Sequence, residues 1–421
     1  MDSLPAETSP TPLASAPPDW GSDPAWKLPG WAEPVIVAGI LFGACFCTRR
    51  RHFAVSRRPS SRYSLLDQDS NSSRDTLLHG ERAKYVDADA DADDDADADS
   101  DYYLSPSSPK HASKRRPFCG TSVLTPNTSR FAANWHSRVL YKFPFLIEMF
   151  YWIVTYAVYR LTHVLSQALF SDAIWDLAQA HGLAVLEFEQ FSALRFLFPV
   201  PELSVQQWFL AGHADLLTFF NKAYALIHIP GTVYFMAWYY YAAPSHAVFA
   251  TVRRTMTLCN LAAFAIFTAY PCMPPRLLPK EYGFVDTVRR DDGESVWMSG
   301  RFVNHLAAMP SMHFGYAFII GVTCLLHAGA LRWAGLGYET RSARAWKWAL
   351  SAFGVLYPLT ILTTIVATAN HYYLDAVVAV LTAAAALLCN RVFMVFVPLE
   401  DLLLWALRAD KPRPNCGYAR A

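Results

Sequence analysis

The sequence predicts an all-α fold: a polytopic membrane helix bundle with a six-helix core and one further N-terminal transmembrane helix. Hydrophobic residues make up 53% of the 421 residues, and charged residues only 17%. That balance is too apolar for an ordinary soluble protein of this length, so the membrane bilayer is the expected solvent. A formal net charge of +1 excludes a nucleic-acid partner, because binding a phosphate backbone needs a concentrated basic surface.

Apolar runs that approach the roughly 20 residues of a membrane crossing recur along the chain. We expect the six core helices at about 145–170, 219–241, 257–273, 311–331, 349–369 and 375–397. A further run at 34–48 is followed by Arg49, Arg50 and Arg51, which indicates an uncleaved crossing with its carboxyl end in the cytosol. The expected parts are a non-cytosolic segment, a transmembrane helix, a disordered cytosolic linker, a membrane catalytic core and a cytosolic tail, at 1–33, 34–48, 49–135, 136–397 and 398–421.

Short loops rich in lysine and arginine mark the cytosolic side of a membrane protein. The loop at 330–348 and the tail after 398 have such an excess, whereas the loop at 274–310 balances its positive and negative side chains. This loop is therefore expected to face the lumen of the Golgi or endoplasmic reticulum, or the outside of the plasma membrane. The tract at 87–101 nearly alternates Asp with Ala and is typical of a solvated linker, and 173–200 is typical of an amphipathic surface helix.

Three short motifs are expected at helix ends on this non-cytosolic face. Pro274-Pro275-Arg276 ends the third core helix, and the guanidinium fork of its arginine suits two phosphate oxygens at once. The alternative is an interfacial arginine that reaches out to lipid. Lys222, near the outer end of the second core helix, is a candidate for a second positive charge at the phosphate, although snorkelling to the interface explains it equally well.

The second motif, Pro310-Ser311-Met312-His313, opens the fourth core helix. Ser311 is expected to cap a helix whose unpaired N–H groups and positive dipole end face an anion. From the first turn, His313 is placed to protonate a departing oxygen, a role that needs a pKa near neutral. A histidine at such a helix end is otherwise an ordinary interfacial polar group.

The third motif places His371 four residues before Asp375. If the carboxylate accepts a hydrogen bond from one ring nitrogen, the other is held unprotonated and aimed outward as a nucleophile. A phosphohistidine intermediate follows from that arrangement. The alternative for this pair alone is a satisfied structural contact.

Together these residues resemble the type 2 phosphatidic acid phosphatase superfamily, whose triad is the histidine of a Pro-Ser-x-His motif and a His-x-x-x-Asp motif. The runs at 270–276, 307–313 and 369–375 are most similar to its inositolphosphotransferase branch, which includes the inositol phosphorylceramide synthases. The resemblance implies His371 as nucleophile, Asp375 as its orienting group and His313 as general acid. Arg276, Ser311 and Lys222 are the expected substrate-binding residues, and no metal or cofactor is expected.

The chain departs from the wider superfamily in having fewer cations. Where the superfamily pattern has an arginine six residues before the third-motif histidine, this chain has Ile365, and no basic residue lies at 349–370. Such a site suits a phosphodiester with one charge better than a doubly charged phosphomonoester. We therefore expect a transferase acting on a membrane lipid, of the phosphoinositide, phosphatidate or ceramide type, with a phosphatidate-type phosphatase as the alternative.

Two non-enzymatic readings stay open. A membrane haem or metal protein would use histidines as ligands, the candidates being His228, His313, His327 and His371. Axial haem ligands should face each other at matched depth, and two of these four lie at opposite ends of one expected helix. The other reading is a catalytically silent scaffold or transporter, which would tolerate the loss of His371. Intramembrane ionisable groups are usually functional, which favours the enzyme.

Overall fold

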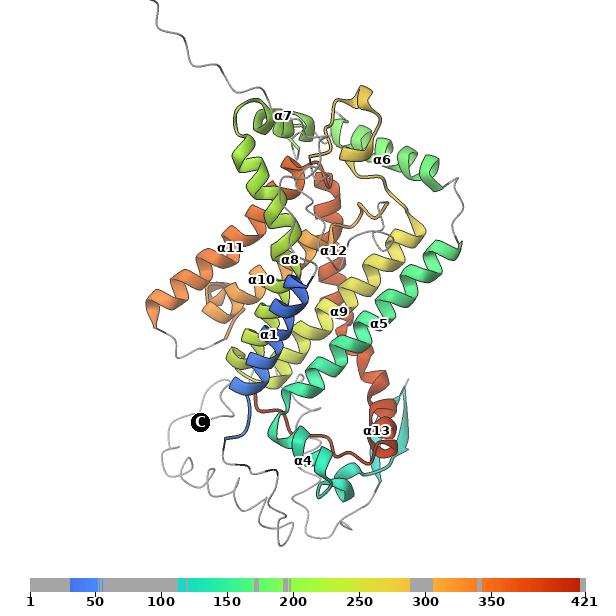
Figure 1. Cartoon of the computed structure of the whole chain (residues 1–421), viewed down its shortest axis with the longest axis vertical. Coiled ribbons are helices and arrows are strands. Elements are labelled where there is room, and N and C mark those ends of the chain that lie inside the picture. Colours follow the sequence, from blue (N-terminus) through green and yellow to red (C-terminus); the bar gives the residue numbers. More distant parts are fainter. Residues whose placement is uncertain are drawn as a thin grey trace, which may run out of the picture.

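A bundle of long helices forms the body of the molecule in the computed structural model (Figure 1). The structure describes residues 31–51, 53, 55, 113–118, 120–169, 174–191, 196, 198–287, 306–338 and 343–416. Two expectations, the non-cytosolic segment up to residue 30 and the Asp/Ala tract at 87–101, lie outside the described residues.

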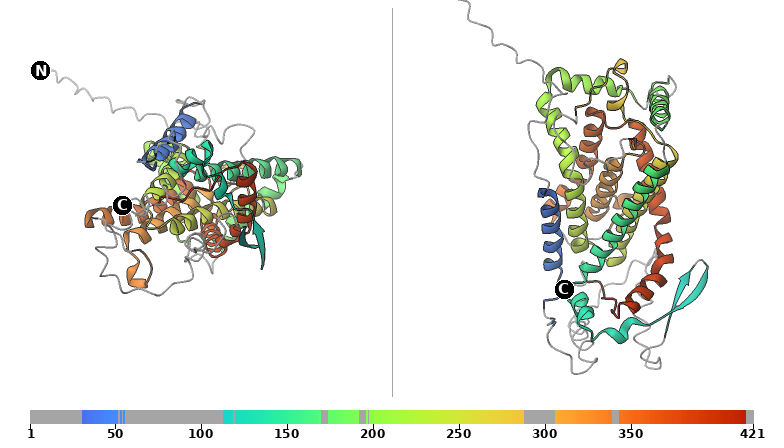
Figure 2. Two further views of the ribbon diagram at one scale, coloured as in Figure 1. Left: turned by 90° about the horizontal axis from the view of Figure 1, so that it is seen from below. Right: turned by 45° about the vertical axis from the view of Figure 1, so that its right-hand side comes forward.

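The long helices run side by side and alternate in direction (Figures 1 and 2). They are α1 (Ala32–Cys47), α5 (Phe145–Leu169), α8 (Ala214–Ala242), α9 (His246–Ala269), α10 (Met312–Ala328), α11 (Arg344–Ala367) and α12 (Tyr373–Cys389). Helix α10 packs against α8, α9, α11 and α12, so it is the central helix of the bundle, while α1 packs on α8 and α5 at the side.

Shorter elements cover the two ends of the bundle (Figure 1). Helices α6 (Ile174–Gln190) and α7 (Glu202–Gly212) lie across one end, called the α6/α7 end below. The opposite α4/α13 end holds α4 (Trp135–Lys142), α13 (Val397–Ala406) and an antiparallel hairpin of β1 (Lys114–Phe118) and β2 (Thr121–Thr125). Short 3-10 turns are η1 (Thr128–Phe131), η2 (Pro275–Leu277), η3 (Lys280–Tyr282), η5 (Arg332–Ala334) and η6 (Asn390–Phe396).

Local sequence signals explain where the helices begin, end and touch. Ser245 caps α9 by accepting a hydrogen bond from the Val248 amide (3.3 Å), and Gly329 ends α10 in the left-handed conformation that glycine adopts most easily (φ 75°). A Cβ on Gly321 would lie 2.5 Å from the carbonyl oxygen of Gly354. Small residues therefore let α10 and α11 approach backbone to backbone, as is common between membrane helices.

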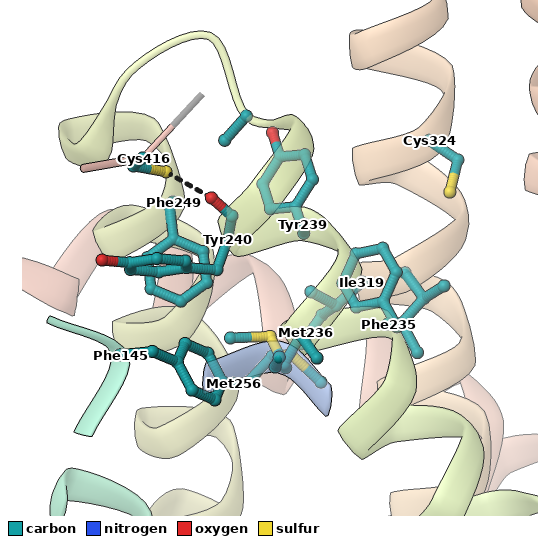
Figure 3. Packing of buried hydrophobic residues seen from close by; sticks show 14 of the residues in the cluster. Phe145, Phe235, Met236, Tyr239, Tyr240, Phe249, Met256, Ile319, Cys324 and Cys416 are labelled. Carbon is teal, nitrogen blue, oxygen red and sulfur yellow. Dashed lines mark hydrogen bonds between the residues drawn. The ribbon is translucent and has the colours of Figure 1, made fainter. Parts of the chain in front are cut away.

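The largest buried cluster among the described residues includes side chains of α5, α8, α9 and α10 (Figure 3). Aromatic rings fill much of it, and Phe145 meets Tyr240 edge to face at 5.1 Å between ring centroids. The Cys416 thiol donates a hydrogen bond to the Tyr240 carbonyl oxygen at 2.9 Å (Figure 3). The last described residues of the chain are thus part of the packed body of the molecule.

Large apolar side chains are exposed along the outer faces of several long helices, as expected for a surface in contact with lipid. Leu161 on α5, Leu356 on α11 and Leu381 on α12 are each at least 60% exposed. By length and composition, two helical segments of the described chain qualify as membrane spans, 344–367 and 373–406. This supports a membrane protein with fewer clear crossings than the sequence analysis expects. Helices α8 and α9 are long enough to cross but are less apolar.

The structure corrects the expected boundaries at two places. The linker expected to be disordered at 49–135 contains the β1–β2 hairpin, which Arg116 and Thr125 fix to Asp401 of α13 at 2.9 and 2.8 Å. The last core helix, expected to run to 397, ends at Cys389 and continues as η6 and α13. The contacts with Asp401 order a hairpin whose strands are polar and basic, which is why composition alone misjudges this segment.

Candidate active site

Backbone hydrogen bonds join the three motif segments at the α6/α7 end. The Ser311 amide donates to the Asp375 carbonyl oxygen (3.1 Å), and the Arg276 amide donates to the Ala369 carbonyl oxygen (2.9 Å). Cys272, just before η2, exchanges backbone hydrogen bonds with the segment that precedes Ser311. The expectation that the three motifs meet is therefore confirmed as geometry, although they come from segments up to about a hundred residues apart.

His371 lies in the turn before α12 and is buried, with 5% of its surface exposed. Its Nδ1 lies 2.7 Å from the Ala308 carbonyl oxygen and 3.2 Å from Asp375 Oδ2. Both neighbours are acceptors, so the tautomer that satisfies them carries its hydrogen on Nδ1. Nε2 is then the unprotonated nitrogen, with a lone pair available for a bond to an electrophile.

Asp375 contacts His371 from the start of α12. Asp375 is the third residue of this helix, whereas His371 lies in the turn before it. Asp375 Oδ2 also accepts a hydrogen bond from the Tyr372 amide at 2.9 Å and so caps the helix. The Tyr372 amide fixes the Asp375 carboxylate, and the carboxylate fixes the imidazole of His371.

The next two amides at the start of α12 donate to two glutamates that sequence reasoning missed. The Tyr373 amide donates to Glu202 Oε1 of α7 at 3.3 Å, and the Leu374 amide donates to Glu189 Oε1 of α6 at 2.5 Å. In the sequence, Glu189 and Glu202 resemble the other acidic residues of an amphipathic surface segment. No local signal shows that these two are the buried ones.

Ser311 caps α10 as expected, since its hydroxyl accepts from the Phe314 amide at 3.4 Å. His313 follows on the first turn, and its ring lies between Tyr224 and His228 of α8, with centroid distances of 3.9 and 4.2 Å. The centroids of His313 and His371 are 6.2 Å apart. Within the described residues, the buried Nε2 of His313 has no hydrogen-bond partner, so this nitrogen is available to a ligand.

His228 belongs to the site although the sequence analysis leaves it out of the catalytic set. Besides contacting His313, its ring stacks on Tyr316 at 5.4 Å. The face of His313 is therefore covered by aromatic rings, which limits its rotation. A histidine in an apolar helix is the only sequence signal that could have found it, and this signal is weak by itself.

Arg276 is the cation of the site, and its charge is partly satisfied. Its guanidinium donates from one terminal nitrogen to both Asp286 oxygens, at 3.1 and 3.3 Å. Its buried Nε has no partner among the described residues. The sequence analysis does not foresee the pairing with Asp286. Lys222 lies on α8 two residues before Tyr224, and its role in binding substrate stays a prediction.

These features define a class of protein: a mainly helical membrane protein with a buried pair of histidines, one of them oriented by a carboxylate, at one end of the bundle. The PAP2 superfamily model matches residues 189–340, so the chain contains a PAP2 superfamily domain there. The match includes Arg276, Ser311 and His313 and stops before His371. Members of this superfamily are generally phosphatases or phosphotransferases that act on lipid phosphates. Neither the curated proteins nor the solved structures include a match to the chain.

Proposed function

We propose that the chain is a membrane phosphotransferase of the inositolphosphotransferase type, which forms a phosphohistidine intermediate at His371. The observation that carries this proposal is the pair of acceptors at Nδ1 of His371, the Ala308 carbonyl oxygen and Asp375. They favour the tautomer with a nucleophilic Nε2, while His313 lies 6.2 Å away between ring centroids. One histidine attacks and the other handles the proton.

In the first half-reaction, Nε2 of His371 attacks the phosphorus of a phosphodiester lipid. The bond from phosphorus to the diacylglycerol oxygen breaks, and protonated His313 gives its proton to that oxygen. In the second half-reaction, the acceptor hydroxyl gives its proton to His313 and its oxygen attacks the same phosphorus. The phosphorus–nitrogen bond then breaks, which restores both histidines and releases the new phosphodiester.

The charge of the site supports a phosphodiester over a phosphomonoester. Asp286 partly neutralises Arg276, and the carboxylate of Asp375 lies beside His371. The N-terminal amides of α10 are also suited to phosphate oxygens and act through a helix dipole of about half a charge. The positive charge available to the phosphate therefore matches one negative charge better than two.

We also propose the topology expected from the sequence: α1 and six core helices cross the bilayer, and the α6/α7 end faces the lumen of an endomembrane or the outside of the plasma membrane. The support is the placement of basic residues. Arg253 and Arg254 follow the start of α9, and Lys142 ends α4, all toward the α4/α13 end (Figure 1). Short basic connections lie on the cytosolic side, so the site would lie on the other face.

The test uses the purified full chain with phosphatidylinositol labelled with 32P, with and without ceramide. We expect labelled protein whose label is lost in acid, as a phosphohistidine is, and transfer of the label to ceramide. His371→Ala should lose both signals, while the control His213→Ala, an exposed histidine near the same end, should keep them. Label retained by His371→Ala would assign the nucleophile elsewhere. Rapid release of inorganic phosphate from phosphatidate, with no lipid product, would favour the phosphatase instead.

A further inference from the structure

Carboxyl groups from three helices meet at the start of α12. Asp375, Glu202 and Glu189 accept hydrogen bonds from the consecutive amides of Tyr372, Tyr373 and Leu374. A helix start always leaves its first amides without intrahelical partners, and one capping side chain usually satisfies one or two of them. Here α6 and α7 each contribute a buried acid to the task, from 185 and 171 residues away along the chain.

Glu189 and Glu202 lie next to each other, because they accept from the consecutive amides of Leu374 and Tyr373. Both are buried, with 3% and 2% of their surface exposed. Glu189 Oε2 is buried and has no donor among the described residues. Two ionised carboxylates have no hydrogen to place between them, so a contact of this kind is satisfied when one of the two keeps its proton.

Several titratable groups among the described residues interact with Glu189. They are Glu202 of α7, Asp375, Tyr372 and Tyr373 at the start of α12, and Cys272 before η2. A lysine or arginine at this place would stabilise two ionised carboxylates. None of the groups named above is a cation, so a proton on one of the two carboxyls relieves the repulsion between Glu189 and Glu202.

We propose that Glu189 and Glu202 share one proton and act as positioning residues for His371, by fixing the first turn of α12 to the surface helices α6 and α7. This inference rests on the proposed function for the part that concerns catalysis. The shared proton itself is independent of which reaction the site performs.

Helix α6 also packs closely against the turn before α12, which supports a positioning role for Glu189. A Cβ on Gly182 would lie 2.7 Å from the Met273 carbonyl oxygen and 2.8 Å from the Tyr372 hydroxyl. The same hydroxyl donates a hydrogen bond to the Met273 carbonyl oxygen at 3.0 Å, and the Met273 amide donates to Ala178 of α6 at 3.0 Å. Helix α6 therefore contacts the turn next to His371 directly, with no space for a side chain at Gly182.

The proton gives the link a pH dependence of known sign. Burial, reinforced by the contact with Glu202, raises the pKa of Glu189 from its ordinary value of 4.5 to about 10. Between these two values the folded chain binds a proton that the unfolded chain has released. The stabilisation is complete below the lower value and is lost as the pH rises toward the upper one. The α12 start should therefore loosen in alkaline solution.

Infrared spectroscopy tests the shared proton directly. At pH 8 the full chain should show the carbonyl stretch of a protonated carboxylic acid. The band should disappear in the double variant Glu189→Gln/Glu202→Gln, and it should persist in Glu187→Gln, an exposed acid on the same helix. A spectrum without this band would overturn the proposal, even if the chain proved to be an active transferase. A chain without transferase activity would overturn only the proposed function.

Kinetics test the positioning role. Glu189→Ala removes the acceptor of the Leu374 amide and should lower kcat roughly tenfold with little change in KM. Glu189→Gln keeps an acceptor and supplies a permanent donor to Glu202, so it should restore kcat and move the alkaline loss of activity to higher pH. Unchanged kcat in Glu189→Ala, in protein that unfolds at the wild-type temperature, would contradict the role. An alkaline limb that is identical in Glu189→Gln and wild type would contradict it as well.

Discussion

The two ends of the bundle satisfy their buried carboxylates in different ways. At the α4/α13 end each has a cationic partner: Glu148 contacts Arg253 and His246, and Asp401 contacts Arg116. At the α6/α7 end, the carboxyls of Asp375, Glu189 and Glu202 accept from backbone amides, and their other neighbours are a histidine or each other. The same residue type serves as half of an ion pair at one end and as a helix cap at the other.

This difference separates a structural role from a chemical one. A carboxylate paired with arginine has its charge cancelled in place, and removing either partner leaves a buried charge that costs stability. A carboxyl group held by backbone amides has no cation that cancels its charge, and at Asp375 such a group can orient an imidazole whose own charge changes during a reaction. We therefore expect substitutions at the α6/α7 end to act mainly on rate, and substitutions at the α4/α13 end to act mainly on stability.

The largest expected effect is on catalysis, from Asp375→Asn. Oδ2 of Asp375 accepts from both the Tyr372 amide and Nδ1 of His371, so the asparagine oxygen can keep both hydrogen bonds. What the substitution removes is the negative charge that holds the ring in its Nδ1–H tautomer and stabilises an imidazolium. We expect kcat to fall about 10²- to 10⁴-fold, with an unfolding temperature close to that of the wild type. The measurements are transferase kinetics and thermal unfolding in the same detergent.

The control for this variant is Asp215→Asn, an exposed acid at the start of α8, which should leave kcat unchanged. Wild-type kcat in Asp375→Asn would show that the carboxylate is only a helix cap. A variant that fails to fold would contradict the proposed division between the two ends.

The next effect is on stability, from Glu148→Ala. Arg253, whose side chain is 15% exposed, would lose its carboxylate partner inside the bundle. Removing one partner of a buried pair typically costs about 3–5 kcal/mol of unfolding free energy. The unfolding temperature in detergent should fall clearly, while kcat for each folded molecule stays near the wild-type value.

Two comparisons sharpen this test. Lys411→Met removes the partner of Glu400 in a more exposed pair, 33% and 17%, and should cost less than about 1 kcal/mol. The double variant Glu148→Ala/Arg253→Met should recover part of the loss, because no unpaired charge remains. A fall in kcat equal to that of Asp375→Asn would show that the two ends are coupled and would break the comparison.

Sequence reasoning found the site residues that sit at helix boundaries. Proline and serine mark the starts of helices, so the order of residues alone was enough to place Ser311, His313 and Asp375 near helix ends. It could not find Glu189 or Asp286. Their importance depends on which side of a helix or turn faces the motif segments, and the sequence of an amphipathic segment leaves several acids equally eligible.

The fold shows the same contrast between features that local sequence signals predict and features that depend on contacts between distant segments. Apolar runs located the long helices to within a few residues at most ends, because burial in lipid and in the bundle requires a continuous apolar stretch. The hairpin was missed since its strands are basic and polar, although Gly120, just before β2, has the positive φ of 80° that tight turns use. The hairpin is held in place by Asp401, which accepts a hydrogen bond from Thr125 and lies 276 residues further along the chain.

The smallest expected effect concerns substrate charge and tests whether the paired cation at the α6/α7 end sets specificity. In Asp286→Asn, the guanidinium of Arg276 loses its negative partner and gains charge for a ligand. A doubly charged phosphate benefits from that charge more than a singly charged diester does. We expect phosphatidate hydrolysis to rise about three- to tenfold relative to inositol phosphate transfer, measured as the ratio of the two kcat/KM values. The control is Asp176→Asn, which changes an exposed acid at the same end and should leave the ratio unchanged. A fall of the ratio in Asp286→Asn would mean that Asp286 holds Arg276 in place for the phosphate rather than limiting its charge.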